Sequence, residues 1–193
     1  DLKSHPALLA WYNVDEPNGN LLPIADEAYQ IYRDNDKHHP VYVVSCSPAH
    51  FKLKNNMCDI LGIDPYVITV SDPEPAFYNI IDWFKVAKAE NGTKSIWGIP
   101  QSHGIKGGDL IQPTTGQLKC QAYLEIVEGA KGLIFFNYNS DNVLTGAQSN
   151  PVLWDYFKTL NAELRGYVPA ILSTDEPDFK VSSLTPPIRV LVK

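Results

Sequence analysis

The chain has 193 residues, 16 basic and 22 acidic side chains, a formal net charge of -6 and 44% hydrophobic residues. This size suggests one domain or part of one, and the composition is that of a globular protein. The acidic balance gives no electrostatic reason to expect a nucleic-acid partner or an anionic membrane partner. No apolar run approaches the roughly 20 residues that a membrane-spanning helix needs, so we expect no membrane partner.

Five short apolar runs follow one another along the chain, and each ends in polar or turn residues. The runs are continuous rather than strictly alternating, which is typical of parallel strands that are buried on both faces. The expected strands are residues 8–14, 41–46, 60–66, 95–100 and 132–138.

Helical spacing of apolar residues separates most of these runs. Asp72 and Pro73 favour a helix start before the second helical stretch, and Thr114 with Gln117 forms a capping-box pattern before the third. The connection 47–59 lacks such a pattern but reaches the dozen or so residues that a parallel crossover needs. The expected helical stretches are 22–32, 77–87, 118–126 and 153–164.

Strands that alternate with helices indicate a parallel sheet with right-handed crossovers. Two architectures compete, an open doubly wound sheet and a part of a (β/α)8 barrel, and the lack of a Gly-rich phosphate motif after any strand weakens the first. Residues 1–166 are therefore expected to form strands four to eight of a partial TIM barrel, and an upstream part of the same barrel is expected as the partner. Residues 167–193 have no helical period and are expected to be a linker and the start of a β-rich domain.

The cysteines and histidines show no metal-binding spacing. Cys46, Cys58 and Cys120 lie in apolar surroundings without a CxxC pattern, so we expect buried free thiols rather than a disulfide. The pair His38-His39 lacks the i,i+4 spacing of helical zinc motifs and is expected to be solvated. We predict no catalytic metal and no cofactor.

The segment Asn91-Gly92-Thr93 is a glycosylation sequon and equally a turn that would end a helix. Such a sequon accepts a glycan in a secretory lumen. We expect an extracellular or secretory-pathway location and a chain that is part of a longer protein.

Polar side chains follow every expected strand, at the end where parallel barrels carry their chemistry. The alternative explanation is that strand ends are polar because turns are. If these side chains converge, their carboxylates, amides and rings suit a sugar. In chain order the candidates are Asn13, Asp15 and Glu16; Ser45, Ser47 and His50; Asp64 and Tyr66; Gln101, Ser102 and His103; and Asn137, Tyr138, Asn139 and Asp141.

Three segments carry a resemblance to known enzymes. HPALLAWYNVDEP resembles the fourth-strand segment of clan-A glycoside hydrolase barrels, in which an acid-base glutamate follows an Asn and precedes a Pro. QLKCQAYLEIVEGAKGLIFFNYNS resembles the seventh helix and eighth strand of related barrels. SIWGIPQSHG with PTTGQLKCQAY resembles the seventh strand and following helix of a less characterised glycosidase-like branch. The resemblance covers about residues 5 to 165.

The resemblance implies roles for particular residues. The acid-base carboxylate falls on Glu16, and Asp15 replaces the Asn that typically holds the sugar 2-hydroxyl. Gln101 occupies the place of the seventh-strand nucleophile, so the second carboxylate is expected to be Asp64 or an upstream residue, with Asp141 and Asp15 as weaker candidates. The expected substrate-binding residues are Asp15, Asn13, Tyr66, Gln101, His103, Asn137 and Tyr138.

Glycoside cleavage needs a proton donor for the leaving oxygen and a second carboxylate that attacks or activates water. Desolvation beside Trp11 and Tyr12, together with the charge of Asp15, is expected to raise the pKa of Glu16 toward the range of a general acid. Trp97, like Trp11, is expected to pack in the core rather than to form a sugar platform. The sequence thus predicts a glycoside hydrolase acting on a poly- or oligosaccharide; the alternative is a barrel that binds carbohydrate without hydrolysing it.

Overall fold

The computed structural model describes residues 2–52, 56–72 and 76–173, and its centre is one curled parallel sheet. The five strands stand in the order β1-β2-β3-β4-β6. This order confirms the prediction of parallel β/α units and is that of a half-barrel, whereas a doubly wound sheet would reverse its order at a switch point. The strands are β1 (Trp11–Tyr12), β2 (Val41–Ser45), β3 (Ile60–Ile63), β4 (Ser95–Gly98) and β6 (Gly132–Leu133).

The two edge strands are shorter than the apolar runs that predict them. β1 keeps two residues of the expected seven-residue strand because it pairs with β2 alone, with Trp11 opposite Val41. β6 likewise pairs only with β4, although the amide of Ile134 still donates to the carbonyl of Gly98 at 3.0 Å. Strand pairing is therefore most extensive at the centre of the sheet, between β2, β3 and β4.

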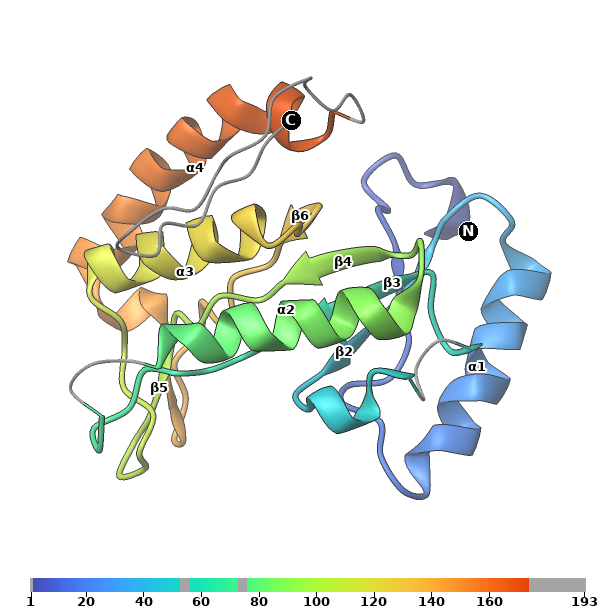
Figure 1. Cartoon of the computed structure of the whole chain (residues 1–193), viewed down its shortest axis with the longest axis horizontal. Helices are drawn as coiled ribbons and strands as arrows, with labels where there is room; N and C mark the ends of the chain where they lie inside the picture. The colour runs from blue at the N-terminus through green and yellow to red at the C-terminus, as the bar shows by residue number, and fades with distance from the viewer. Residues whose placement is uncertain (1, 53–55, 73–75, 174–193) are drawn as a thin grey trace.

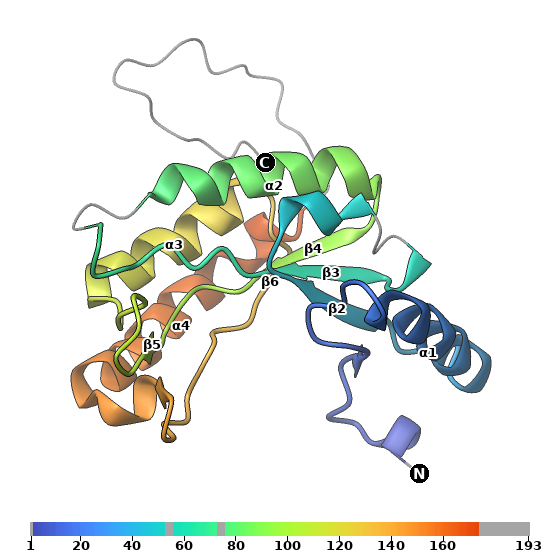
Figure 2. The same cartoon turned by 90° about the horizontal axis from the view of Figure 1, so that it is seen from below.

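Four long helices lie along one side of the curled sheet (Figures 1 and 2). They are α1 (Leu21–Asn35), α2 (Phe77–Asn91), α3 (Thr115–Val127) and α4 (Pro151–Ile171). The predicted capping box is confirmed, because Thr114 Oγ1 accepts from the amide of Gln117 and the Gln117 side chain accepts from the amide of Thr114. The start predicted for α2 is wrong at Asp72, since the helix begins at Phe77; Pro73 and Glu74 lie outside the described residues.

Alternating side chains divide the strands between two faces. In β3, Leu61 and Ile63 are fully buried in the cluster that joins the sheet to α1 and α2. Gly62 and Asp64, with the opposite parity, face the concave side. A second cluster joins α3, α4 and β6, and a smaller one around Tyr42 covers the concave face. This arrangement leaves the carboxyl ends of the strands as the place where polar groups gather.

A small second sheet ties the loops at these carboxyl ends together (Figure 1). β5 (Gly104–Ile105) and β7 (Leu144–Thr145) pair in antiparallel fashion. Asp109 accepts from the amide and the hydroxyl of Ser71 at 3.0 and 2.8 Å, which joins the loop after β3 to the loop after β4. The amide of Ser102 donates to the carbonyl of Phe136 at 2.7 Å, which extends the tie to the loop after β6. The loops therefore form one wall beside the strand ends.

The last described helix extends past residue 166, the end of the predicted barrel segment. Helix α4 continues to Ile171 and includes Pro169, so the first residues of the expected linker are helical. Residues 174–193 lie outside the described part, and the linker and β-rich domain stay a prediction. None of the described helices is long and apolar enough to span a membrane.

Candidate active site

The carboxyl ends of the five parallel strands surround a pocket of about 500 Å³ on the concave side of the sheet. Its acidic lining residues come from the turns after the first and third strands. Its rings come from β1, β2 and β4 and from the segments that follow β3 and β6. The acidic residues are Asp15, Glu16 and Asp64, and the aromatic ones are Tyr12, Tyr42, Tyr66, Trp97 and Phe136.

A row of three rings crosses the pocket wall from β1 to β4. The ring centres of Tyr12 and Tyr42 are 5.4 Å apart, and those of Tyr42 and Trp97 are 5.5 Å apart. Gly62 of β3 makes room for this row, because a Cβ at that position would lie 2.3 Å from the hydroxyl oxygen of Tyr42. Trp97 was expected in the core; it packs in the concave cluster and also lines the pocket.

Glu16 and Asp64, the predicted catalytic pair, are brought together at the rim of this pocket. Asp64 directly follows β3 and is 3% exposed. Glu16 lies in the turn after β1 with φ at 42°, in the left-handed region that non-glycine residues rarely adopt. The Glu16 side chain lies within hydrogen-bonding reach of the Asp64 carboxyl. Two carboxyls can form such a bond only when one of them carries a proton.

The pKa of Asp64 lies well above its usual range. Burial is the largest cause, and the contact with Glu16 and the charges of Glu16 and Asp15 add to it, so that the pKa reaches about 8. Asp64 is buried, whereas Glu16 is only half-buried.

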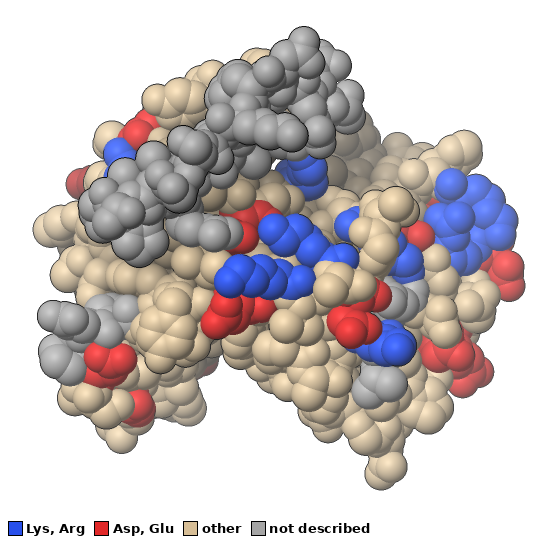
Figure 3. Space-filling view, in the orientation of Figure 1, with Lys and Arg blue, Asp and Glu red and all other residues tan. Residues whose placement is uncertain are grey.

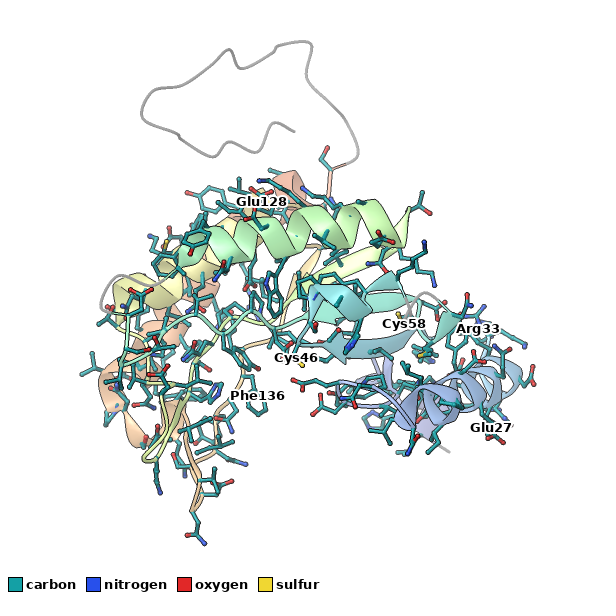
Figure 4. The ribbon with its side chains drawn as sticks, turned by 60° about the horizontal axis from the view of Figure 1, so that its bottom comes forward. Glu27, Arg33, Cys46, Cys58, Glu128 and Phe136 are labelled. Atoms are coloured by element: carbon teal, nitrogen blue, oxygen red, sulfur yellow. The ribbon has the colours of Figure 1, made fainter. Side chains whose placement is uncertain are left out.

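Two further side chains hold the carboxyl groups in place. The Tyr12 hydroxyl donates to Asp15 at 2.5 Å, and burial with this hydrogen bond raises the pKa of Tyr12. Cys46 follows β2, and its thiol lies within hydrogen-bonding reach of Glu16; partial burial of the thiol and this contact raise the pKa of Cys46 to about 12. Figure 4 shows Cys46 and Phe136 toward the carboxyl end of the sheet, away from Glu128 on the helical side. Cys46 was missed as a site residue, although it follows a strand as Glu16 and Asp64 do.

Gln101 and His103, predicted to bind substrate, lie outside the pocket lining. Gln101 is fully buried; its Nε2 donates to the carbonyls of Ile68, His103 and Ile111, and its Oε1 accepts from the amide of Ile68. The His103 ring is 2% exposed, with Nδ1 3.1 Å from the carbonyl of Phe136, and burial lowers its pKa. These contacts fasten the loop after β4 to its neighbours.

The other predicted binding residues divide between the pocket and its surroundings. Tyr66 and Asp15 line the pocket. Asn13 does not, because its Nδ2 donates to the carbonyls of Ala25 at 2.8 Å and Met57 at 3.0 Å. Asn137 and Tyr138 line a separate hollow of about 330 Å³ beside α4. Sequence order thus predicted the correct end of the sheet but not which side chains turn inward.

Several features outside the pocket differ from expectation. The ring of His39 is not free in solvent, since its Nδ1 lies 2.7 Å from the buried carboxylate of Asp36, which also accepts from Trp11 Nε1. Cys46 is exposed rather than buried, although all three cysteines are free. The sequon residue Asn91 is 4% exposed and donates to the carbonyl of Ala87. Across the described ranges, no three His, Cys, Asp or Glu side chains gather in an arrangement suited to a metal ion.

A second buried carboxyl lies behind the sheet. Glu125 of α3 is fully buried against Gly98 of β4, where a Cβ would come within 2.0 Å of its Oε2. Neither of its oxygens has a hydrogen-bond partner among the described residues. Burial, together with the charge of Asp64, raises the pKa of Glu125 well above its usual range.

Comparison with known proteins supports the fold. No family model matches the chain, and no curated protein matches its sequence. Among solved structures, the chain is similar to a "putative alpha-L-fucosidase" from Bacteroides thetaiotaomicron, with a TM-score of 0.56, 12% identity, and coverage of 82% of this chain and 58% of that one. The chain therefore spans little more than half the length of that neighbour, and at this identity the likeness shows a shared fold.

Proposed function

We propose that this chain is part of a glycoside hydrolase that acts on a poly- or oligosaccharide, with Glu16 and Asp64 as its carboxyl pair. The observation that carries the proposal is the contact of these two carboxyls in an aromatic pocket at the strand ends. Cleavage of a glycosidic bond needs such a pair in two protonation states, one acid and one carboxylate. The solved neighbour, a "putative alpha-L-fucosidase", agrees with this class of reaction.

The raised pKa of Asp64 supports a division of roles within the pair. A carboxyl with a pKa of about 8 suits the donor of a proton to the leaving oxygen. Glu16 then supplies the carboxylate that attacks the sugar or activates water. This assignment reverses the one that the resemblance implied, in which Glu16 is the general acid/base. Carboxyls in contact are closer than the roughly 5 Å of retaining enzymes, so the proposal requires that they separate when a substrate binds.

The test is turnover of a panel of aryl glycosides by the whole protein and by the Glu16→Gln and Asp64→Asn variants. Both variants are expected to lose about 10²- to 10⁴-fold in rate, the usual contribution of an acid-base group. Asp82→Asn is the matched control, because Asp82 is an exposed carboxylate on α2 that pairs with Lys85. Unchanged turnover in both pocket variants would remove the pair from catalysis.

Substrates whose leaving groups differ in acidity distinguish the proton donor from the second carboxylate. A dinitrophenyl glycoside needs little help from a proton donor, so the variant that lacks the donor keeps most of its rate on this substrate. If Asp64 is the donor, Asp64→Asn retains activity on dinitrophenyl glycosides and loses it on methyl glycosides, whereas Glu16→Gln loses both. The opposite pattern would restore the donor role to Glu16.

A second candidate function, carbohydrate binding without hydrolysis, is favoured by Gln101. The place where related barrels carry a nucleophile holds an amide here, and all its hydrogen bonds go to backbone groups. A barrel that only binds needs rings and polar partners but no working carboxyl pair. It would bind oligosaccharides with equal affinity in the wild-type protein and in Asp64→Asn, with no release of product.

We further infer that β/α units upstream in the same barrel complete the site. β1 and β6 each pair on one side only, and apolar side chains are exposed along both edges. Leu9 beside β1 is 68% exposed, and Ile134 and Phe136 beside β6 are 40% and 41% exposed. An open edge of this kind invites pairing with further strands. The structure of a longer chain is expected to place three more parallel strands between β1 and β6.

A further inference from the structure

We propose that the pocket selects a cationic sugar, one that carries an ammonium group in place of a hydroxyl, over neutral and anionic sugars. The inference rests on the proposed function for one point, that the ligand is a carbohydrate. It adds that this carbohydrate carries a positive charge. The pocket combines three carboxyls with five aromatic rings, and none of its described lining residues is Lys, Arg or His.

The carboxyl groups offer acceptors that the protein itself does not satisfy. Asp64 is 3% exposed, and its Oδ1 accepts no hydrogen bond from any donor in the described part of the chain. The hydroxyl of Tyr42, in a side chain that is 6% exposed and lines the same pocket, is also without a partner there. Buried polar groups are nearly always paired, so these atoms mark a place for a ligand that donates. An ammonium group supplies three N–H donors and a positive charge, which suits carboxyl acceptors better than a hydroxyl does.

The rings supply the second part of the recognition. Tyr12, Tyr42 and Trp97 form a continuous row, and the ring centres of Tyr66 and Phe136, which line the same pocket, are 6.2 Å apart. The face of an aromatic ring attracts a cation, and the attraction grows where water is excluded. An anionic sugar would meet like charges and rings without a basic partner, so uronic and sulfated sugars are disfavoured.

The negative character is local to the pocket rather than a property of the whole surface. Acidic and basic side chains are mixed over α2 on the face shown in Figure 3. There Lys85 pairs with Asp82 at 3.0 Å, and Lys88 pairs with Glu128 at 3.4 Å. The pocket instead concentrates charge of one sign between low-dielectric walls, which raises the local concentration of a ligand of opposite charge.

The test compares three tetrasaccharides by calorimetry with the whole protein in mildly acidic buffer. Glucosamine tetrasaccharide, cellotetraose and the N-acetylglucosamine tetrasaccharide share the β-1,4 backbone and differ only at C2, which carries an ammonium, a hydroxyl or a neutral amide. We expect the glucosamine tetramer to bind about tenfold more tightly than the other two, the factor that about 1.4 kcal/mol produces. Because the effect is electrostatic at an open pocket, the preference is expected to shrink in high salt.

Variants assign the preference to this pocket. Glu16→Gln and Asp15→Asn are each expected to reduce the preference for the ammonium sugar several-fold while affinity for cellotetraose changes little. Asp82→Asn, outside the pocket, should leave all three affinities unchanged, and circular dichroism checks that each variant is folded. Equal or weaker binding of the ammonium sugar, no binding of any of the three, or a preference that both pocket variants keep would each overturn the proposal.

The outcome is separable from that of the proposed function, because binding is measured without turnover. Selective binding of the glucosamine tetramer by a protein that cleaves no glycoside would refute the hydrolase and leave this inference standing. Cleavage of neutral aryl glycosides that depends on Glu16 and Asp64, without preference for the ammonium sugar, would refute this inference alone.

Discussion

Replacing Asp64 by Asn is expected to flatten the dependence of folding stability on pH. The pKa of Asp64 rises from 3.8 to about 8 on folding, chiefly because the carboxyl is buried. Between these values the folded chain keeps a proton that the unfolded chain has lost, so stability falls as pH rises. From about pH 5 to about pH 8 the change reaches at most ~4 kcal/mol, at 1.36 kcal/mol for each pH unit. Relaxation and water penetration lower the cost of ionising a buried carboxyl, so we expect about half of this maximum, ~2 kcal/mol.

Urea unfolding followed by circular dichroism at about pH 5 and about pH 8 measures the effect. The wild-type chain is expected to lose ~2 kcal/mol more than Asp64→Asn over this interval. Asp82→Asn controls for the loss of an exposed carboxylate and should follow the wild type. Parallel curves for the wild type and Asp64→Asn would refute the reasoning, since they would mean that Asp64 is ionised in the folded chain.

Three further substitutions test other parts of the structure. Gln101→Glu, which installs the carboxylate of related barrels, is expected to destabilise by ~3 kcal/mol or more, because an acceptor would replace the donor to three buried carbonyls; thermal denaturation measures it. Gly62→Ala should cost about 1–3 kcal/mol by pushing the Tyr42 ring aside, whereas Gly116→Ala, in open space on α3, should be neutral or stabilising by up to ~1 kcal/mol. Glu125→Gln should raise folding stability at alkaline pH and change it little in acid, because it removes a buried carboxyl with a raised pKa. Urea unfolding at several pH values measures this difference. An unchanged stability at alkaline pH would mean that the Glu125 carboxylate has a stabilising partner.

The fold could be predicted well from the sequence because its elements depend on local patterns. Continuous apolar runs identified all five parallel strands, and the capping box at Thr114 gave the start of α3 to within one residue. Strand lengths could not be predicted, because a residue such as Val14 continues the apolar pattern of β1 without a second neighbouring strand to pair with. The small sheet of β5 and β7 was also missed, since two-residue strands have no periodicity to detect.

The sequence placed Glu16 and Asp64 at the same end of the sheet, and the structure shows both in the lining of one pocket. Glu16 and Asp64 each follow a strand, and parallel strands place their carboxyl ends at one edge. The roles of Gln101 and Asn13 needed the structure, because their partners are backbone carbonyls distant in sequence. The raised pKa of Asp64 could not be predicted from the sequence either. The sequence gives only neighbours along the chain, whereas burial depends on the packing of β3 between β2 and β4.

Three features that cost stability lie at this pocket, although Asn13, Asn91, Glu125 and Asn137 carry unpaired polar atoms elsewhere. Glu16 is the non-glycine residue with positive φ among those described, and a left-handed conformation of this kind costs on the order of 1 kcal/mol or more. Asp64 beside it is buried with an oxygen that accepts no hydrogen bond from the described residues, and the Tyr42 hydroxyl in the same pocket has no partner among them either. Gln101, by contrast, has every amide group engaged in holding the neighbouring loops. Sequences normally remove such costs unless a ligand or a reaction uses them. The turn at Glu16 is therefore better explained as a site held ready for a substrate than as the end of a strand.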